Sequence, residues 1–324
     1  MKKRYLALAT CSLTILLSAI AISQTRTTDH DVNEQVTGQL TSQAVSKAVS
    51  RAVSKEQMLA ALSQGNKVDF TRISSADWQV PLSGLVNLNH PKAKQAKLVD
   101  KNEAIQIFAY HIKHPSQGDY LIDTGVSQAL FDDPSQFGIN NLLQSLFGFA
   151  QLSMTQSTQD YLEHNQIKQV DGVFLTHLHL DHVTGLPDIN LDAPIYVGNN
   201  EGQSRYWMNV ATKHVINLLL KGRPALQQWQ GEIVDIFADG SAFALHMPGH
   251  TPGSTAYLVN AKTGPVLVVG DVSHTRWGWD NQVEPGDFTR DQQQNQTNLL
   301  QLKLLAQQLK HQYPSTQVML GHQN

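Results

Sequence analysis

A histidine-rich segment that directly follows a short apolar run constrains this chain more than any other feature. Residues 172–175 read Gly-Val-Phe-Leu, as expected of a buried strand, and residues 176–185 read Thr-His-Leu-His-Leu-Asp-His-Val-Thr-Gly. Within six positions lie four side chains that can bind metals: His177, His179, Asp181 and His182. Imidazoles packed this closely disfavour each other's protonation unless a cation lies among them. The pattern therefore predicts a metal site after a strand, rather than a loop of solvated histidines.

The spacing within this segment divides its side chains into two groups. In an extended chain His177 and His179 project to the same side, so both rings can bind one ion. His182 lies an odd number of residues from both of them and so projects to the opposite side of an extended chain, and Gly185 allows the chain to turn. We therefore expect Asp181 and His182 to serve a neighbouring ion.

Composition limits the chemistry of such a site. The chain has 14 His and only 1 Cys among its 324 residues, which excludes a disulfide framework and a cysteine-ligated metal cluster. Ligation by nitrogen and oxygen favours two divalent ions, Zn²⁺ first, with Mn²⁺, Co²⁺ or Fe²⁺ as alternatives. The formal net charge of −3 indicates no nucleic-acid partner.

The N-terminal region has the pattern of a secretory signal. Basic residues 2–4 precede an apolar run over residues 5–22, and small residues follow, so we expect a signal peptide over 1–23 with cleavage after Ala21 or Ser23. A retained anchor is the alternative. Cleavage would remove Cys11 and place the mature protein in the periplasm or outside the cell. No second stretch reaches the ~20 apolar residues of a membrane span.

The rest of the chain divides into a leader and one domain. Residues 24–67 are polar and contain three tandem Ala-Val-Ser-Lys/Arg units at 44–55, which predict a solvated leader or an amphipathic helix. The compact domain is expected over 68–324. We expect its strands at residues 104–110, 120–122, 172–175, 195–197, 243–245, 266–269 and 317–320. Helices are expected at residues 141–152, 157–164 and 291–311, which gives a layered α/β fold.

The segment at residues 177–182 resembles the HxHxDH signature of the metallo-β-lactamase superfamily. Further motifs follow in that family's order. They are His250 in Pro-Gly-His-Thr-Pro-Gly, Asp271 after an apolar strand, and His322 near the chain end, with Asp123 in an earlier Asp-Thr-Gly. The resemblance implies a four-layer αββα sandwich, with two mixed β-sheets packed face to face and helices on both outer faces.

The resemblance also implies two ligand sets. One ion would be bound by His177, His179 and His250, and the second by Asp181, His182 and His322. Asp271 would bridge the two ions, and Asp123 would support the site from behind. A water activated by this centre would attack a lactone, ester or related carbonyl, and Asp181 would shuttle the proton.

The motifs are closest to the N-acyl-homoserine lactonase branch, with one departure. A tyrosine that contacts the lactone carbonyl in that branch is replaced here by His274, which becomes a candidate catalytic residue. Alternatives are β-lactamase or phosphotriesterase activity, a mononuclear-iron oxidoreductase of the same fold, or a non-catalytic relative. Apolar residues at 131–149 and 206–220, with Trp277 and Trp279, would form either a pocket for the apolar portion of a small-molecule substrate or ordinary core. The oligomeric state is left open.

Overall fold

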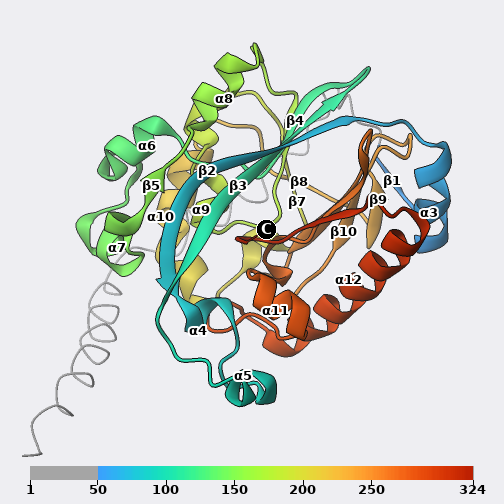
Figure 1. The fold of residues 1–324 in the computed structure, drawn as a ribbon. Coiled ribbons are helices and arrows are strands. Elements are labelled where there is room, and N and C mark those ends of the chain that lie inside the picture. Colours follow the sequence, from blue (N-terminus) through green and yellow to red (C-terminus); the bar gives the residue numbers. More distant parts are fainter. Residues whose placement is uncertain (1–49, 324) are drawn as a thin grey trace, which may run out of the picture. The chain divides into compact units, whose positions relative to one another are not determined.

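Two β-sheets organise the part of the chain that the computed structural model describes, residues 50–323 (Figure 1). The six-stranded sheet has the order β1 (Arg51–Ala52), β9 (Ile233–Asp235), β10 (Ala242–His246), β11 (Thr255–Ala261), β12 (Gly264–Val268) and β13 (Gln317–Met319). The seven-stranded sheet has the order β5 (Ser153–Met154), β2 (Asp69–Pro81), β3 (Asn102–His114), β4 (Gly118–Ile122), β6 (Gly172–Phe174), β7 (Ile195–Val197) and β8 (Gln227–Gln228). Both sheets are mixed, because β12 and β13 pair in parallel, as do β4, β6, β7 and β8.

Alternation along the strands separates the layers. In β10, Phe243 and Leu245 belong to an outer cluster, whereas Ala244 belongs to the cluster between the two sheets. That inner cluster also contains Tyr110 and Phe174 of the seven-stranded sheet. Because side chains alternate between faces of a strand, each sheet needs apolar cover on both sides.

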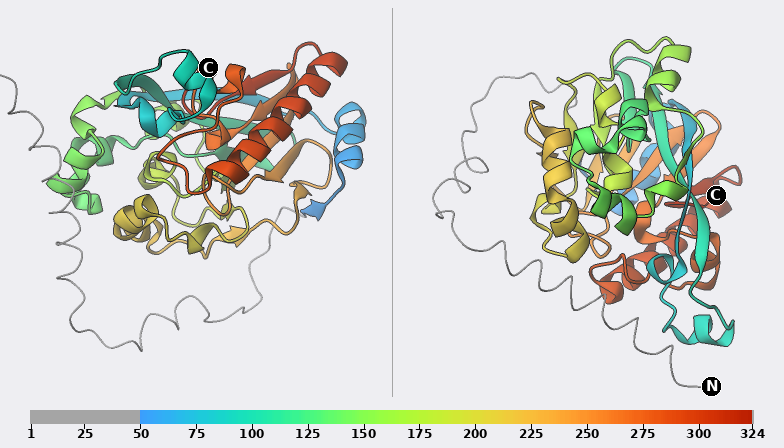
Figure 2. Two further views of the ribbon diagram at one scale, coloured as in Figure 1. Left: turned by 90° about the horizontal axis from the view of Figure 1, so that it is seen from below. Right: turned by 90° about the vertical axis from the view of Figure 1, so that its left-hand side faces the viewer.

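Helices supply the outer cover. Leu299 and Leu302 of α12 (Gln292–Gln312) pack with the outer face of the six-stranded sheet, and so does α3 (Lys55–Gln64). The seven-stranded sheet is covered by α8 (Thr158–His164) and α10 (Trp207–Leu220), through residues such as Tyr161 and Val215. Figure 2 shows α12 and α10 on different sides of the sheets. The expected four-layer α/β sandwich is confirmed.

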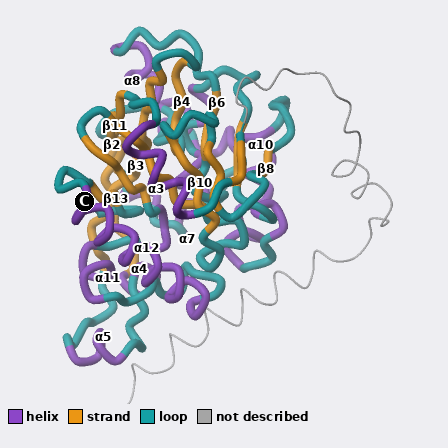
Figure 3. The backbone as a smooth tube through the Cα atoms, turned by 90° about the vertical axis from the view of Figure 1, so that its right-hand side faces the viewer, coloured by secondary structure: helices purple, strands orange, loops and turns teal. Residues whose placement is uncertain are grey.

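The remaining elements are short and lie in the connections, as Figure 3 shows by colour. The α-helices are α4 (Leu82–Leu85), α5 (Pro91–Gln95), α6 (Gln128–Asp132), α7 (Asn141–Leu146), α9 (Leu180–Val183) and α11 (Arg276–Asn281). The 3₁₀ helices are η1 (Pro134–Phe137), η2 (Phe149–Gln151), η3 (Leu186–Asp188), η4 (Glu201–Gln203) and η5 (Gly270–Val272). No helix among residues 50–323 is both long and apolar enough to cross a membrane.

The described residues just before residue 68 take part in the sheet packing, since β1 pairs with β9 and α3 packs against the six-stranded sheet. Ser54, in the last repeat, caps α3, and Gln57 completes the capping box. Met58 and Leu62 lie on one helical face and are buried against the six-stranded sheet. Because the region is mostly polar, its composition did not indicate that these two apolar residues bind α3 to the six-stranded sheet. The expected signal peptide and the leader up to residue 49 lie outside the described residues.

Candidate metal centre

The histidine motif begins where a buried strand ends. β6 lies between β4 and β7 in parallel pairing, and His177 and His179 follow it directly. Asp181 and His182 then lie in α9, so the short helix turns both side chains away from the strand direction. The carboxyl ends of parallel strands meet at one edge of a sheet, which is where α/β folds place their ligands.

The other motif residues reach the same place from the six-stranded sheet. His250 lies in the turn between β10 and β11, while Asp271 and His322 follow β12 and β13. Because β12 and β13 are parallel neighbours, their ends bring Asp271 and His322 together. Gly321 permits the close approach, since a Cβ there would lie 2.1 Å from Asp271 Oδ1.

The structure brings both expected ligand sets together. One potential ligand atom from each of His177, His179, His250 and Asp271 lies within 4.8 Å of the others, and the same holds for Asp181, His182 and His322. Asp271 Oδ2 lies at the centre, 3.6 Å from Nε2 of His177 and 3.4 Å from Nε2 of His182, His250 and His322. One carboxylate oxygen thus faces the imidazoles of both sets, as expected of a bridging ligand.

The outer nitrogen of each of four rings is held by an oxygen. Asp123 Oδ2 lies 2.9 Å from His182 Nδ1, and the carbonyl oxygen of Gln106 lies 2.9 Å from His322 Nδ1. The other two rings contact hydroxyl oxygens instead. Thr176 Oγ1 lies 3.1 Å from His177 Nδ1, and Thr289 Oγ1 lies 3.0 Å from His250 Nδ1. Such partners fix the ring and direct its other nitrogen inward.

The crowding of these groups fits a bound cation. Nε2 of His250 lies 2.9 Å from Nδ1 of His179 and 3.2 Å from Nε2 of His177. Nε2 of His182 and Oδ1 of Asp271 are buried without a hydrogen-bond partner among the described residues. Buried polar atoms are normally paired, so these atoms call for a ligand that the protein itself does not supply. The donor set of imidazole nitrogens and carboxylate oxygens suits divalent metal ions such as zinc.

The pKa values of the three histidines in the first ligand set favour the unprotonated rings that can bind a metal ion. Burial holds the pKa of His177 and His250 well below the usual range and lowers the pKa of His179 to about 4, so these rings are unprotonated at neutral pH. Burial also raises the pKa of Asp271, but the surrounding imidazoles, His274 first, outweigh it and hold that pKa well below its usual range. In the second set, burial is outweighed by carboxylates, which raise the pKa of both rings, Asp123 that of His182 and Asp271 that of His322, so metal binding there must displace protons.

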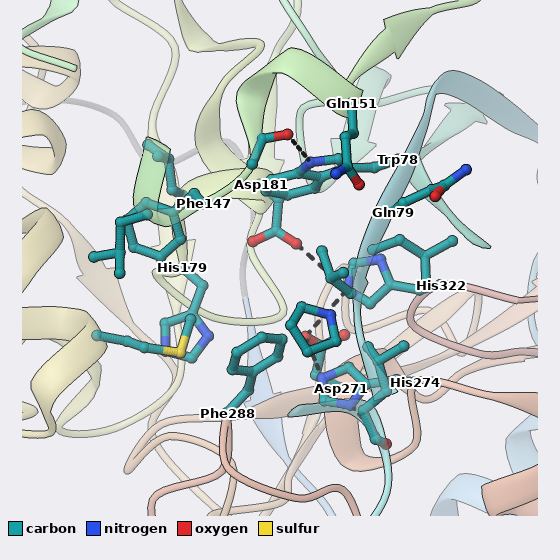
Figure 4. Close-up of a pocket in the computed structure, with 18 of the residues that line it drawn as sticks. Trp78, Gln79, Phe147, Gln151, His179, Asp181, Asp271, His274, Phe288 and His322 are labelled. Carbon is teal, nitrogen blue, oxygen red and sulfur yellow. Dashed lines mark hydrogen bonds and ion pairs between the residues drawn. The ribbon is translucent and has the colours of Figure 1, made fainter. Parts of the chain in front are cut away.

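A cavity of about 280 Å³ opens onto this centre (Figure 4). Its polar wall contains His179, Asp181, His250, Asp271, His274 and His322. Its apolar wall includes Trp78, Leu146, Phe147, Trp207, Met208 and Phe288. Asp181 and His322 point toward one another there, with Oδ2 of the aspartate 3.4 Å from Nε2 of the histidine.

The apolar residues noted in the sequence divide between the two expected roles. Leu146, Phe147, Trp207 and Met208 line the cavity. Trp279 and Leu219 are core residues that pack against α12 and the seven-stranded sheet respectively. Trp78 and Phe288 were not expected in the cavity, because they lie far from the motifs in sequence.

Sequence reasoning missed Glu201, which links the two loops of the first ligand set. Its buried carboxylate accepts hydrogen bonds from the backbone N–H of Leu178 at 2.7 Å and of Gly253 at 2.9 Å, and from the Thr251 hydroxyl at 2.6 Å. Leu178 lies between two expected ligands, and Thr251 follows a third. A signal was present, since Glu201 closely follows the strand that was expected at residues 195–197.

Fold and site together define a metal-binding hydrolase of the four-layer α/β sandwich class. Residues 103–322, more than half of the chain, match the model of the metallo-β-lactamase superfamily. The chain therefore belongs to this superfamily, as the resemblance in its motifs predicted.

Two relatives of the chain are N-acyl homoserine lactonases. The chain is 27% identical over 190 residues to an N-acyl homoserine lactonase of a Bacillus species, covering 55% of this chain and 68% of that protein. It is 32% identical over 160 residues to the N-acyl homoserine lactonase AttM of Azorhizobium caulinodans, covering 47% of this chain and 58% of the relative, somewhat over half its length.

A solved structure shows the same fold. It is an N-acyl homoserine lactone hydrolase with the product N-hexanoyl-L-homoserine bound at its catalytic metal center, 16% identical, with a TM-score of 0.58. The similarity covers 80% of this chain and 94% of that one. The protein is thus a superfamily hydrolase related to N-acyl homoserine lactonases.

Proposed function

We propose that this protein is a dinuclear-metal hydrolase that opens a lactone or related ester carrying an apolar acyl group, with an N-acyl-homoserine lactone as the leading substrate class. The observation that carries the proposal is the position of Asp271 Oδ2, 3.4–3.6 Å from Nε2 of one or more histidines of each ligand set. His177, His179 and His250 would hold one ion, and Asp181, His182 and His322 the other. Zinc is the proposed metal.

The chemistry follows from the groups that face the cavity. A pair of divalent ions supplies a water of lowered pKa and polarises a carbonyl oxygen. Asp181 is placed to take a proton, since its carboxylate lines the cavity and its side chain is 18% exposed. In ring opening the water oxygen bonds to the carbonyl carbon and the ring C–O bond breaks. Asp181 carries the water's proton to the departing ring oxygen, which becomes the alcohol of the hydroxy-acid product.

The apolar wall supports an acyl substrate. Trp78, Phe147 and Phe288 line the cavity beside the polar centre, so a ligand with a polar head and an apolar tail would match both walls. The names of the relatives support the same substrate class. Trp78 is held in place by its indole N–H, which donates to the carbonyl oxygen of Gly148 at 3.1 Å.

A substrate panel tests the proposal. Zinc-loaded protein should hydrolyse N-acyl-homoserine lactones faster than an aryl ester, a phosphotriester or a β-lactam, and His179→Ala should abolish every activity. The same protein after exhaustive chelation should be inactive. Full activity after chelation would contradict the proposal. One iron per chain with oxygen uptake would also contradict it, and would support a mononuclear-iron oxidoreductase instead.

We further propose that the protein works in the periplasm or outside the cell. The support is the basic and apolar pattern of residues 1–23. Mass spectrometry of the protein recovered from its native host should find an N-terminus at residue 22 or 24. An intact Met1 or an N-terminus elsewhere would contradict cleavage after Ala21 or Ser23.

A further inference from the structure

His274 lines the cavity but belongs to neither ligand set expected from the sequence. It lies three residues after Asp271 and is 2% exposed. The sequence predicted that it would take the place of a tyrosine that contacts a substrate carbonyl. Its ring contacts indicate another role.

Both ring nitrogens of His274 face oxygen atoms. Nδ1 lies 3.3 Å from the backbone carbonyl oxygen of Leu85, and Nε2 lies 3.0 Å from Oδ2 of Asp271. Both oxygens only accept hydrogen bonds, so a ring with one proton can donate to only one of them. In the tautomer that donates from Nδ1 to Leu85, Nε2 is the atom that can bind a metal ion. Nε2 then has a lone pair and no proton. In that tautomer His274 has no N–H toward the cavity centre and does not take the part of a tyrosine hydroxyl, which would donate a hydrogen bond to a substrate carbonyl.

The same arrangement occurs at an expected ligand, His322. Its Nδ1 faces the carbonyl oxygen of Gln106 at 2.9 Å, and its Nε2 lies 3.4 Å from Oδ2 of Asp271. The rings of His274 and His322 are stacked, with centroids 5.4 Å apart. One potential ligand atom from each of Asp271, His274 and His322 lies within 4.8 Å of the others. In Figure 4 these three residues lie together at one wall of the cavity.

We infer that His274 is a metal ligand, binding the second ion through Nε2 together with Asp181, His182, His322 and the bridging Asp271. This inference rests on the metal centre of the proposed function but not on its substrate. A lone pair that faces a carboxylate oxygen is unfavourable until a cation lies beside both. The second set then has five protein ligands and the first has four. Since catalytic zinc sites usually have three protein ligands and an open position, the second ion would be the less open of the two.

Cobalt titration of the metal-depleted full-length protein tests the inference. His274→Phe removes the ligand atom Nε2. His274→Gln replaces the imidazole with an amide, whose N–H can still reach the Leu85 carbonyl. In both variants we expect one of two Co²⁺ ions to bind at least about tenfold more weakly, by analogy with losses at supporting residues. The visible absorption of that ion should change with its coordination. Equilibrium dialysis gives the affinities, and circular dichroism checks folding.

His111→Phe is the matched control. His111 is also buried, and its Nε2 lies 2.8 Å from an Asp119 carboxylate oxygen, but it is in none of the metal-binding groups found among the described residues. The His111→Phe substitution should leave the affinities for both Co²⁺ ions unchanged. Unchanged or tighter cobalt binding by folded His274→Phe would overturn the inference, because phenylalanine offers no ligand atom. Tighter binding by folded His274→Gln would also overturn it, since it would show that a protonated ring at this position repels the ion. Failure of the wild type to hydrolyse lactones would reject the proposed substrate without altering the cobalt result.

Discussion

Replacing Glu201 with alanine should destabilise the two loops that carry the first ligand set. The carboxylate is 1% exposed and accepts three hydrogen bonds, from Leu178 N, Gly253 N and the Thr251 hydroxyl. These bonds join the histidine motif after β6 to the turn after β10. No other side chain is hydrogen-bonded to both loops in this way among the contacts of the described residues.

The size of the loss follows from which donors remain unpaired. Thr251 keeps a second partner, the Ser254 hydroxyl at 2.8 Å, so two backbone N–H groups lose theirs. An unpaired buried donor costs about 1–3 kcal/mol, which gives a total of about 2–6 kcal/mol. Burial raises the pKa of Glu201 in spite of these donors, so removing the charge recovers part of its desolvation cost. We therefore expect a loss in the lower half of that range.

Urea unfolding of the metal-depleted protein at neutral pH measures this loss without a contribution from metal binding. Glu163→Ala is the control, because Glu163 is exposed on α8, and such substitutions change stability by about 0.5 kcal/mol or less. A loss below about 1 kcal/mol for Glu201→Ala, at an unchanged denaturant slope, would refute the reasoning that two buried donors depend on this carboxylate.

Three further perturbations test other parts of the account. Asp123→Asn removes the charge that orients His182 and should weaken one of the two metal ions about 10–100-fold in a chelator competition assay; equal affinity would remove Asp123 from the site. Trp207→Ala should raise KM for a long acyl chain more than for a short one, and equal changes would argue that the chain leaves the cavity elsewhere. Burial lowers the pKa of His111 in the folded protein, so below about pH 6.5 the unfolded chain binds a proton at this ring more readily and the fold loses stability. His111→Gln should make the urea midpoint fall less steeply as the pH is lowered. Urea midpoints that fall equally in the variant and the wild type would contradict this expectation.

The motifs could be predicted because each follows a short apolar strand that is readable by itself. His177, Asp271 and His322 all lie just beyond such strands, and the resemblance of their motifs to those of the superfamily implied that they meet in space. The long helix α12 and the strands β3 and β4 were predicted from their apolar patterns at residues 291–311, 104–110 and 120–122.

Other elements could not be read because their patterns are interrupted. β2 carries a bulge between Ser74 and Ala76, which shifts the alternation of buried residues halfway along the strand. α10 begins without a side-chain cap, so nothing marked its start at Trp207. The partners of the metal-binding rings were hidden for another reason. The carbonyl oxygens of Gln106 and Leu85 are present at every residue, and only the fold selects them.

Anomalous diffraction from zinc-soaked crystals at the zinc absorption edge tests the central claim most directly. We predict two peaks on either side of Asp271 Oδ2, about 3.5–4 Å apart, as is typical of two-metal sites. One peak should lie among His177, His179 and His250, and the other should be bounded by Asp181, His182 and His322. A single peak, or none within reach of these side chains, would contradict the dinuclear centre.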